Sequence, residues 1–196
     1  MSEIVSKPAV TSAALDELVR NRWSPRIYDP SHELTNSEIE SLGEAFRWAP
    51  SSMNLQPWKL VILTRGGELH RRVSEEALGG FNGAWAPNAS ALAIVLGEKL
   101  NAKGEERNRV DTAYDLGLAS MKFIIQSEAM GLKSHVMGGI DHAKIAEILS
   151  AEDHFVMVAM AVGKQAPLEG QEEAIVTREQ TPRVRKEDAY LINQTL

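Results

Sequence analysis

The chain of 196 residues contains no cysteine. This absence excludes disulfide bridges, thiolate zinc sites, iron–sulfur clusters and a cysteine nucleophile. Long apolar runs are also missing, because the longest, residues 155–162, is too short to span a bilayer. The first residues lack the long apolar core of a signal peptide. We therefore expect a cytoplasmic protein that does not associate with membranes.

Positive charge is scarce, since 21 basic residues stand against 27 acidic ones and the formal net charge is −6. This balance argues against a general nucleic-acid-binding protein, although it leaves room for a local basic pocket. The length suits one domain. We expect a single domain over residues 1–196, in which residues from about 164 to 196 form a polar C-terminal arm.

Several common catalytic motifs are absent. Gly163-Lys164 lacks the upstream glycine and the hydroxyl residue of a P-loop, and no Gly-x-Gly-x-x-Gly pattern follows a strand. Gly-x-Ser-x-Gly and Ser-x-x-Lys patterns are missing too. The five histidines show no close metal-binding spacing, so we assign no metal site and expect each histidine at the surface or at a boundary. If the chain is an enzyme, a bound cofactor is expected to bring the reactivity.

Hydrophobic periodicity predicts interleaved helices and strands. Thr11 or Ser12 can cap a first helix, and Thr35 with Glu38 has the spacing of a capping box. The predicted helices cover residues 14–21, 36–49, 67–78, 110–130 and 141–149, and the predicted strands cover residues 59–64, 91–96, 133–137 and 155–162. Residues 79–88 and 101–108 are expected to be loops. This order indicates an α/β or α+β layer with a mixed sheet.

The helix predicted over residues 110–130 is the longest and is apolar around much of its girth, with Gly131 as a C-terminal stop. Such a helix must be buried on most sides. In a chain of this size, a partner subunit is the expected second wall for it.

Residues 49–58, Ala-Pro-Ser-Ser-Met-Asn-Leu-Gln-Pro-Trp, join a predicted helix to a predicted strand. Pro50 and Pro57 each fix φ near about −65° and restrict the residue before them. Between them, Ser51, Ser52 and Asn54 offer hydroxyl and amide groups on a stiffened backbone. The composition suits a surface that binds a polar, planar ligand, and it suits a rigid structural turn equally well.

Two basic patterns alternate along segments without regular structure. Arg22, Ser24 and Arg26 can face one side, where two guanidinium groups and a hydroxyl match a phosphate. They could instead be surface residues that pair with nearby carboxylates. Arg183 and Arg185 repeat the pattern in the predicted arm, where it is also typical of a solvated tail.

Met137-Gly138-Gly139 follows a predicted strand and precedes a predicted helix. Paired glycines let backbone N–H groups approach a ligand closely, although a tight turn would use the same residues. Taken together, the four segments offer phosphate partners, groups for a heteroaromatic edge and bare backbone N–H groups. Flavin mononucleotide (FMN) needs this set.

On these motifs the chain resembles, over nearly its whole length, the nitroreductase family of FMN-dependent oxidoreductases. Residues 22–26, Arg-Trp-Ser-Pro-Arg, are similar to its Arg-x-Ser-x-Arg element. Residues 49–58 match its Ala-Pro-Ser-Ser-x-Asn-x-Gln-Pro-Trp signature at every fixed position. Gly138-Gly139 resembles the glycine pair near flavin N5, and Arg183 with Arg185 resembles the basic pair of the tail.

The resemblance implies an α+β nitroreductase-like fold, with a central mixed sheet flanked by helices, a long dimer-interface helix and an extended C-terminal arm. It implies a homodimer with two FMN sites, each lined by both subunits. The implied cofactor-binding residues are Arg22, Trp23, Ser24, Arg26, Pro50, Ser51, Ser52, Asn54, Met137, Gly138, Gly139, Arg183 and Arg185.

Roles follow from the same resemblance. The arginines and Ser24 would hold the phosphate, with Arg26 there or at the pyrimidine edge. Ser51, Ser52 and Asn54 would bind the ribityl chain or the ring from the opposite subunit, and Gly138 or Gly139 would donate an N–H to N5.

The implied activity is that of an NAD(P)H oxidoreductase in which flavin N5 is the reactive centre and no side chain is catalytic. Electrons pass from NADH or NADPH to an electron-poor small molecule, such as a nitroaromatic or a quinone, in a ping-pong cycle. A reductive dehalogenase, a flavin-modifying enzyme of the same fold and a non-catalytic FMN-binding or sensor protein are the alternatives.

The chain departs from the family pattern at four places. Trp23 replaces a common Arg or His, and Met53 stands where smaller residues are usual. Gly138 occupies a position that some members fill with Glu, which alters the surface over the flavin. The linker over residues 97–109 is short, so the sequence does not define a substrate lid.

Overall fold

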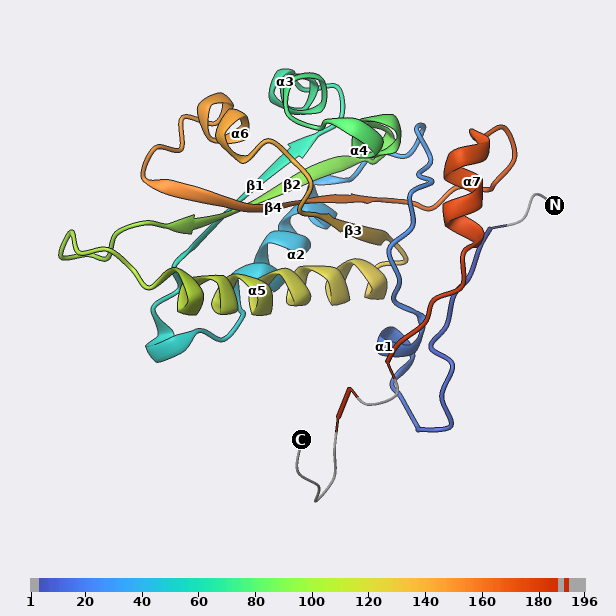
Figure 1. Ribbon diagram of the computed structural model, residues 1–196, viewed down its shortest axis with the longest axis horizontal. Helices are drawn as coiled ribbons and strands as arrows, with labels where there is room; N and C mark the ends of the chain where they lie inside the picture. The colour runs from blue at the N-terminus through green and yellow to red at the C-terminus, as the bar shows by residue number, and fades with distance from the viewer. Residues whose placement is uncertain (1–3, 187–188, 191–196) are drawn as a thin grey trace.

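A four-stranded sheet separates two layers of helices in the computed structural model, which describes residues 4–186, 189 and 190 (Figure 1). The strands are β1 (Trp58–Thr64), β2 (Ala91–Glu98), β3 (Lys133–Met137) and β4 (His154–Gly163), in the spatial order β1-β2-β4-β3. Every pairing between these strands is antiparallel, so the expected mixed sheet is wrong. The reason is that β4 lies between β2 and β3 and runs opposite to both.

Alternation along the central strands divides the core into two parts. Leu92 and Ile94 of β2 pack into one hydrophobic cluster, whereas Ala93 and Val95 pack into the cluster on the other face. The sheet therefore buries both faces at its centre. β1 lies at an edge and is only partly buried, although its sequence predicts a buried strand.

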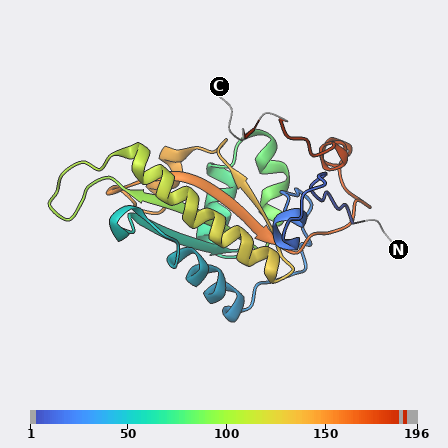
Figure 2. The ribbon, with the colours of Figure 1, turned by 90° about the horizontal axis from the view of Figure 1, so that it is seen from below.

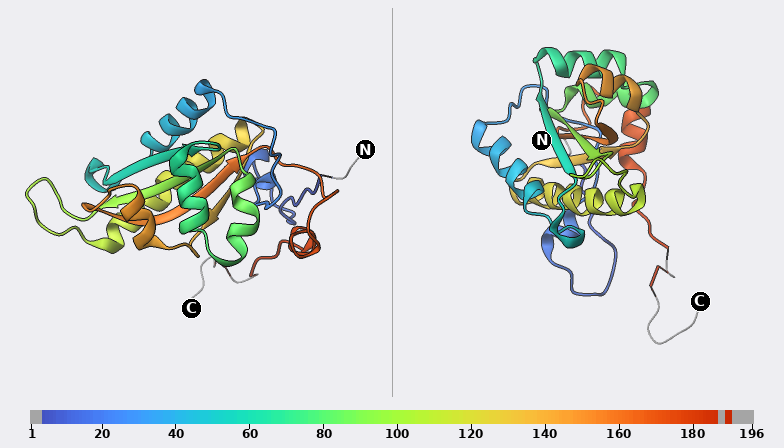
Figure 3. Two further views of the ribbon diagram at one scale, coloured as in Figure 1. Left: turned by 90° about the horizontal axis from the view of Figure 1, so that it is seen from above. Right: turned by 90° about the vertical axis from the view of Figure 1, so that its left-hand side faces the viewer.

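Two helices cover one face of the sheet, and three cover the other (Figures 1 and 3). α2 (Asn36–Arg47) and α5 (Arg109–Ala129) lie on the first face. α3 (Glu68–Glu76), α4 (Gly80–Trp85) and α6 (His142–Ile148) lie on the second.

Local sequence signals set the ends of two of these helices. The predicted capping box of α2 is confirmed, because the Thr35 hydroxyl accepts from the Glu38 N–H and the Glu38 carboxylate accepts from the Thr35 N–H. α5 stops before Gly131, whose φ of 72° suits glycine. The helix predicted over residues 110–130 is thus confirmed within one residue at each end.

The first helix begins later than the sequence predicts. α1 (Glu17–Asn21) is capped by the Asp16 carboxylate, which accepts from the Leu18 N–H at 2.9 Å. The Thr11 hydroxyl accepts from the Ala13 N–H instead, and this bond forms a local turn. The expected cap at Thr11 or Ser12 is therefore wrong.

Residues 79–88 are predicted as a loop but contain α4 and the 3₁₀ turn η2 (Ala86–Asn88). Trp85 anchors this segment, since its indole is fully buried and stacks on Tyr28 with ring centroids 6.2 Å apart. A Cβ at Gly83 would lie 2.5 Å from the Leu78 carbonyl oxygen, so glycine permits this close packing. Long-range burial thus overrides the local glycine signals.

The C-terminal arm is more structured than the sequence predicts. It contains α7 (Glu173–Gln180), and Ile175 of this helix packs into the hydrophobic core. The far end of the predicted arm, residues 191–196, lies outside the described residues.

Segments from both ends of the chain lie side by side next to α1 (Figures 1 and 2). The Ala9 N–H donates to the Arg20 carbonyl at 2.8 Å, and the Lys7 ammonium donates to the Thr181 carbonyl at 2.7 Å. Among the described helices, none is both long and apolar enough to cross a membrane.

Candidate functional site

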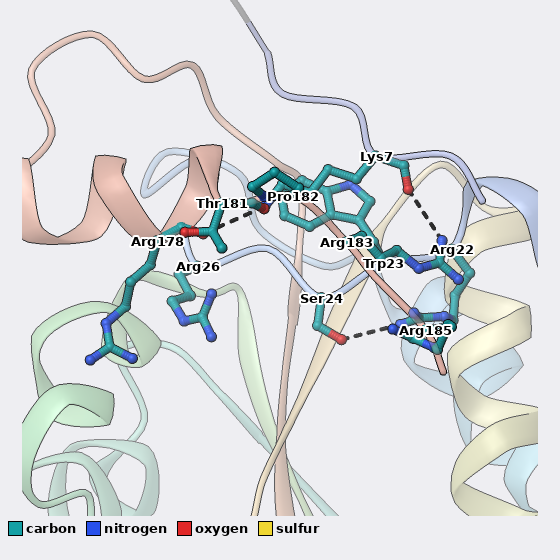
Figure 4. Close-up of a pocket in the computed structure, with 10 residues that line it drawn as sticks. All are labelled: Lys7, Arg22, Trp23, Ser24, Arg26, Arg178, Thr181, Pro182, Arg183 and Arg185. Atoms are coloured by element: carbon teal, nitrogen blue, oxygen red, sulfur yellow. Dashed lines mark hydrogen bonds between the residues drawn. The ribbon is translucent and has the colours of Figure 1, made fainter. Parts of the chain in front are cut away.

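A cavity of about 380 Å³ opens where the two chain ends meet the segment that follows α1 (Figure 4). Six of its lining side chains are cationic, and no lining residue is acidic. The lining residues are Lys7, Arg22, Trp23, Ser24, Arg26, Arg178, Thr181, Pro182, Arg183 and Arg185. The structure therefore brings together the two predicted basic patterns, which lie far apart in the sequence.

The segment over residues 22–28 bends at Arg26 and is held by hydrogen bonds from two sides. His135 of β3 makes a 2.9 Å hydrogen bond with the Pro25 carbonyl, and the Ile27 carbonyl accepts from the Ala166 N–H at 3.1 Å. Trp23, Pro25 and Ile27 are buried, whereas Arg22, Ser24 and Arg26 are partly exposed and line the cavity. The alternate residues Arg22, Ser24 and Arg26 thus line one cavity, as the sequence pattern predicts, and Trp23 between them lines it as well.

The arginines fall into two groups within the cavity (Figure 4). Arg22 donates to the Ser24 hydroxyl at 3.1 Å and lies near Arg183 and Arg185, while Arg26 lies near Arg178. Burial, and then the positive charge of Arg183, lowers the pKa of Arg22. Burial and the neighbouring Arg185 likewise lower the pKa of Arg183. Both groups stay protonated at neutral pH, so the cavity holds repelling positive charges that an anion would stabilise.

Two cavity cations, Lys7 and Arg178, are not predicted from the sequence. Lys7 belongs to the predicted irregular lead-in and carries no pattern that marks it. Arg178 lies on α7, where the sequence predicts a polar arm without regular structure. Arg183 donates from one nitrogen to the Lys7 and Arg20 carbonyls at 3.2 Å each. This bond brings the arm to the N-terminal segment and so closes the cavity.

Residues 49–58 form a tightly wound, exposed turn with the 3₁₀ element η1 (Ser52–Asn54). Three of its non-glycine residues have left-handed backbone angles: φ is 50° at Met53, 56° at Asn54 and 49° at Gln56. The Ser52 N–H donates to the buried Asp115 carboxylate of α5 at 3.0 Å, and the Ser51 hydroxyl accepts from the Gln56 N–H. Fixed bonds to α5 and within the turn therefore maintain an unfavourable backbone, which is a common feature of functional sites.

The turn and α1, which precedes the segment that lines the cationic cavity, lie toward opposite ends of α5 (Figure 1). Ser52 is bonded to Asp115, whereas Arg22 lies near Glu128 at the other end of the helix. These two helix positions are about 20 Å apart, at a rise of about 1.5 Å per residue. Pro50, Ser51 and Ser52 instead line a separate cavity of about 390 Å³ with residues of α5. One chain thus keeps these two predicted parts of the site apart.

The glycine pair lies at the free edge of the sheet. Gly138 and Gly139 follow β3, and neither amide donates a hydrogen bond to another described residue. His135, which contacts Pro25, is about 10 Å away along the same strand, at about 3.3 Å per residue. The Met137 side chain is buried in the core, so only its backbone can face a ligand at this edge.

A chain of contacts connects the Arg26 end of the cavity to this glycine pair. Arg178 stacks on Phe81 of α4 with its guanidinium 4.2 Å from the ring centroid. The adjacent Asn82 donates from its side chain to the Gly139 carbonyl at 2.9 Å. The predicted loop over residues 79–88 therefore contributes to the site as a helix, which the sequence does not indicate.

The chain is similar in sequence and fold to several known proteins. A model of the nitroreductase family matches residues 19–96 and 82–164. An oxygen-insensitive NADPH nitroreductase of Helicobacter acinonychis is 26% identical over 184 residues, covering 76% of this chain and 86% of that protein. A protein of Lactiplantibacillus plantarum described as a CLA biosynthesis enone reductase is 22% identical over 202 residues, covering 85% of this chain and 91% of that protein.

A crystal structure described as an oxidoreductase containing FMN superposes on this chain with a TM-score of 0.85. The two sequences are 28% identical, and the match covers 95% of each chain. Since the family model covers well over half of the sequence, the chain belongs to the nitroreductase family.

Proposed function

We propose that this chain is an FMN-dependent NAD(P)H oxidoreductase that reduces an electron-poor organic acceptor. The observation that carries the proposal is the cationic cavity built on residues 22–26 and 183–185. The family membership and the relatives with nitroreductase and FMN in their names support it. When bound, FMN supplies the redox chemistry, since it takes a hydride from NAD(P)H and returns electrons to an acceptor.

The donor set of the cavity fits a phosphate group. Arg22, Arg183 and Arg185 offer guanidinium groups beside the Ser24 hydroxyl, with no carboxylate in the lining. In this proposal these four residues hold the phosphate, and Trp23 is buried behind them. A charge-assisted hydrogen bond of this kind contributes about 1.5–3 kcal/mol to binding.

The remainder of the site suits the ring system of the cofactor. Arg26 lies between the phosphate end and Gly139, along the contacts through Arg178 and Phe81. Its positive charge stabilises negative charge on the bound ring. The free amides of Gly138 and Gly139 offer donors to ring nitrogen or oxygen atoms. The protein thus orients the cofactor and adjusts its electrostatics, and no side chain serves as a nucleophile.

We further propose that the protein acts as a homodimer in which Ser51, Ser52 and Asn54 reach the cofactor of the partner subunit. A second copy is needed because about 20 Å of α5 separates these residues from the cationic cavity of their own chain. Large apolar side chains are exposed near the turn and on α5, with Trp48 72%, Met53 89% and Tyr114 70% exposed. An apolar surface of this kind is typical of an interface between subunits.

We also propose that residues 1–196 act as one domain. Ile175 of α7 packs into the same core as α3, α4 and α6, and Lys7 and Arg183 connect the two chain ends. In this proposal, the C-terminal arm is part of the cofactor site.

The experiment is a titration of the purified protein with FMN, followed by addition of NADH or NADPH under nitrogen. We expect tight flavin binding, bleaching of the flavin absorbance, and turnover with a quinone, a nitroaromatic or an enone. Protein that binds no flavin would contradict the proposal. Bound flavin that NAD(P)H cannot bleach would favour the alternative of a non-catalytic FMN-binding or sensor protein. Turnover with haloaromatic acceptors alone would favour the alternative of a reductive dehalogenase.

A further inference from the structure

Glu179 of α7 is an acidic residue at the back of the cationic cavity. Its side chain is fully buried, at 0% exposure. One carboxylate oxygen accepts from the Arg26 N–H at 2.7 Å and from the Ile27 N–H at 3.2 Å. The other oxygen is buried and has no hydrogen-bond partner among the described residues. A carboxylate is thus kept out of water to bind two adjacent backbone amides.

These two amides belong to the segment that lines the cavity. The backbone bends at Arg26, and this bend lets the Arg26 and Ile27 N–H groups converge on one carboxylate oxygen. Ile27 packs into the core, whereas Arg26 lines the cavity. Because Glu179 fixes both N–H groups, it fixes the direction in which the Arg26 side chain points. It does so without forming an ion pair with the guanidinium, which stays available to a ligand.

The charged side chains that face Glu179 are positive. Arg26 on the 22–28 segment and Lys7 on the N-terminal segment face it, Arg178 precedes it on α7, and the neutral Tyr28 phenol lies close to it. Burial raises the pKa of Glu179, whereas the two backbone bonds and the two cations oppose that rise. An anion in the cavity and the carboxylate therefore compete for the same positive field.

We propose that Glu179 is a positioning residue of the cofactor site, which holds Arg26 toward the cavity through the Arg26 and Ile27 amides. The inference rests on the proposed function, since the ligand that Arg26 meets there is the cofactor. It assigns to α7 a role in cofactor affinity that is separate from packing the arm onto the core. It follows that the hydrogen-bond acceptor at residue 179 favours cofactor binding, whereas its negative charge does not favour it.

Two variants of nearly equal size separate these contributions. Glu179→Gln keeps an acceptor for the two amides and removes the charge, whereas Glu179→Met fills the same volume without an acceptor. We expect Glu179→Met to bind FMN about tenfold more weakly, since Arg26 is then no longer held toward the cavity before the ligand binds. We expect Glu179→Gln to bind FMN as tightly as the wild type or more tightly, since one competing anion is gone.

Ile175→Ala is the matched control, because Ile175 is buried on the same helix but bonds to no cavity residue. The affinity for FMN is measured by quenching of flavin fluorescence, the affinity for inorganic phosphate by calorimetry, and the stability by thermal unfolding without ligand. Amide hydrogen exchange of residues 22–27 is followed without any ligand. We expect faster exchange at Arg26 and Ile27 in Glu179→Met than in Glu179→Gln or the wild type.

The inference is overturned if Glu179→Met lowers FMN affinity no more than Ile175→Ala does, or if Glu179→Gln loses as much affinity as Glu179→Met. Should Glu179→Met be too unstable to purify, weaker FMN binding by Glu179→Gln is by itself sufficient to overturn it. A wild type that binds phosphate but not FMN contradicts the proposed function alone, and the phosphate affinities of the variants then test Glu179. A wild type that binds neither ligand contradicts both.

Discussion

The segments over residues 22–26 and 49–58 carry the two longest motifs of the chain, yet the fold treats them in opposite ways. The first is partly buried, bends at Arg26 and is bonded to His135 of β3 and to Glu179 of α7. The second is a wound, exposed turn that α5 anchors through Asp115. The first segment faces a cavity that its own chain completes, whereas the second presents polar groups on an apolar outer surface.

This difference determines what each segment requires in order to bind a ligand. Repulsion within a cluster of like charges lowers the stability of the folded state, and the same charges attract an anion. The first segment is therefore ready to bind a ligand in a single chain. The cavity of about 390 Å³ that the turn lines has no lysine or arginine among the described residues of its lining, and in our proposal the turn needs a second copy of the chain to meet the cofactor. We therefore expect changes to the first segment to alter FMN affinity through charge. Changes at the second segment should alter FMN affinity through the assembly of two chains.

The largest effect is expected from Gly117→Arg on α5. Gly117 lies on the exposed face between Tyr114 and Met121, and a Cβ there would meet no atom of its own chain within 4 Å. The variant should fold, elute as a monomer, and lose the contacts of the turn with the partner's cofactor. Three hydrogen bonds of about 1 kcal/mol each correspond to roughly 100-fold weaker FMN binding. Size-exclusion chromatography with light scattering, together with an FMN titration, measures both quantities.

The matched control for this variant is Gly43→Arg on α2, where a Cβ also meets no atom within 4 Å. We expect it to remain dimeric and to bind FMN normally. A Gly117→Arg protein that remains dimeric would show that the exposed face of α5 is not the interface.

The converse change is Arg22→Ala, which removes a guanidinium from the cavity and leaves the turn intact. We expect FMN affinity to fall by about 1.5–3 kcal/mol, because one charge-assisted hydrogen bond is lost, with no change in assembly. Arg47→Ala serves as the control, since Arg47 is an exposed arginine that pairs with Glu44 on α2. Equal FMN affinity in Arg22→Ala and Arg47→Ala would refute the assignment of the cavity to the phosphate.

A pH effect is expected at His135, which holds the first segment through Pro25. Burial lowers the pKa of His135 from 6.5 to about 4. Between these pH values the unfolded chain binds a proton that the native state does not, so the free energy of unfolding falls as the pH falls from about 6.5 to 4. Because the imidazole is partly exposed, we expect about 2 kcal/mol of this loss to come from His135.

Urea unfolding at pH 7 and pH 4.5 measures this loss. Between these two pH values, the free energy of unfolding of the variant His135→Gln should fall by about 2 kcal/mol less than that of the wild type. The other titratable groups contribute equally to both proteins. Parallel pH profiles for the two proteins would show that His135 has the same pKa in the native and unfolded states.

The smallest effect is expected at Met53 in the turn. Its φ of 50° is unfavourable for an L-residue and natural for glycine, so Met53→Gly should stabilise the fold by about 0.5–1 kcal/mol. The comparison is made in the monomeric Gly117→Arg background, where contacts with a second copy do not contribute. Ser150→Gly, at the same φ of 50° but outside the turn, should give a similar gain. A loss of stability at Met53 alone would mean that its side chain packs within the monomer.

Local patterns were sufficient for much of the fold. The capping box of α2, the length of α5 with Gly131 behind it, and the bounds of β3 depend on neighbours within a few residues in the chain. The alternation over residues 22–26 likewise predicts which side chains share a face. These features can be predicted because a helix repeats every 3.6 residues and a strand every two.

The missed elements depend on distant partners. α4 forms despite its glycines because Trp85 is buried against Tyr28 and His135, and α7 forms in a polar arm because Ile175 reaches the core. Lys7, Arg178 and Glu179 join the site through segments that only the packed structure brings together. No short-range pattern in the sequence marks them.

The sequence by itself determined the chemistry of the chain: no thiol and no metal-binding histidine pattern, with arginines spaced for a phosphate and a turn rich in hydroxyl and amide groups. The tertiary structure alone decided where these parts lie. It closes the cationic cavity with both chain ends, and it puts the turn about 20 Å away along α5. The physical reason is that residue types set which groups can bind, whereas the burial of distant apolar residues sets which groups meet.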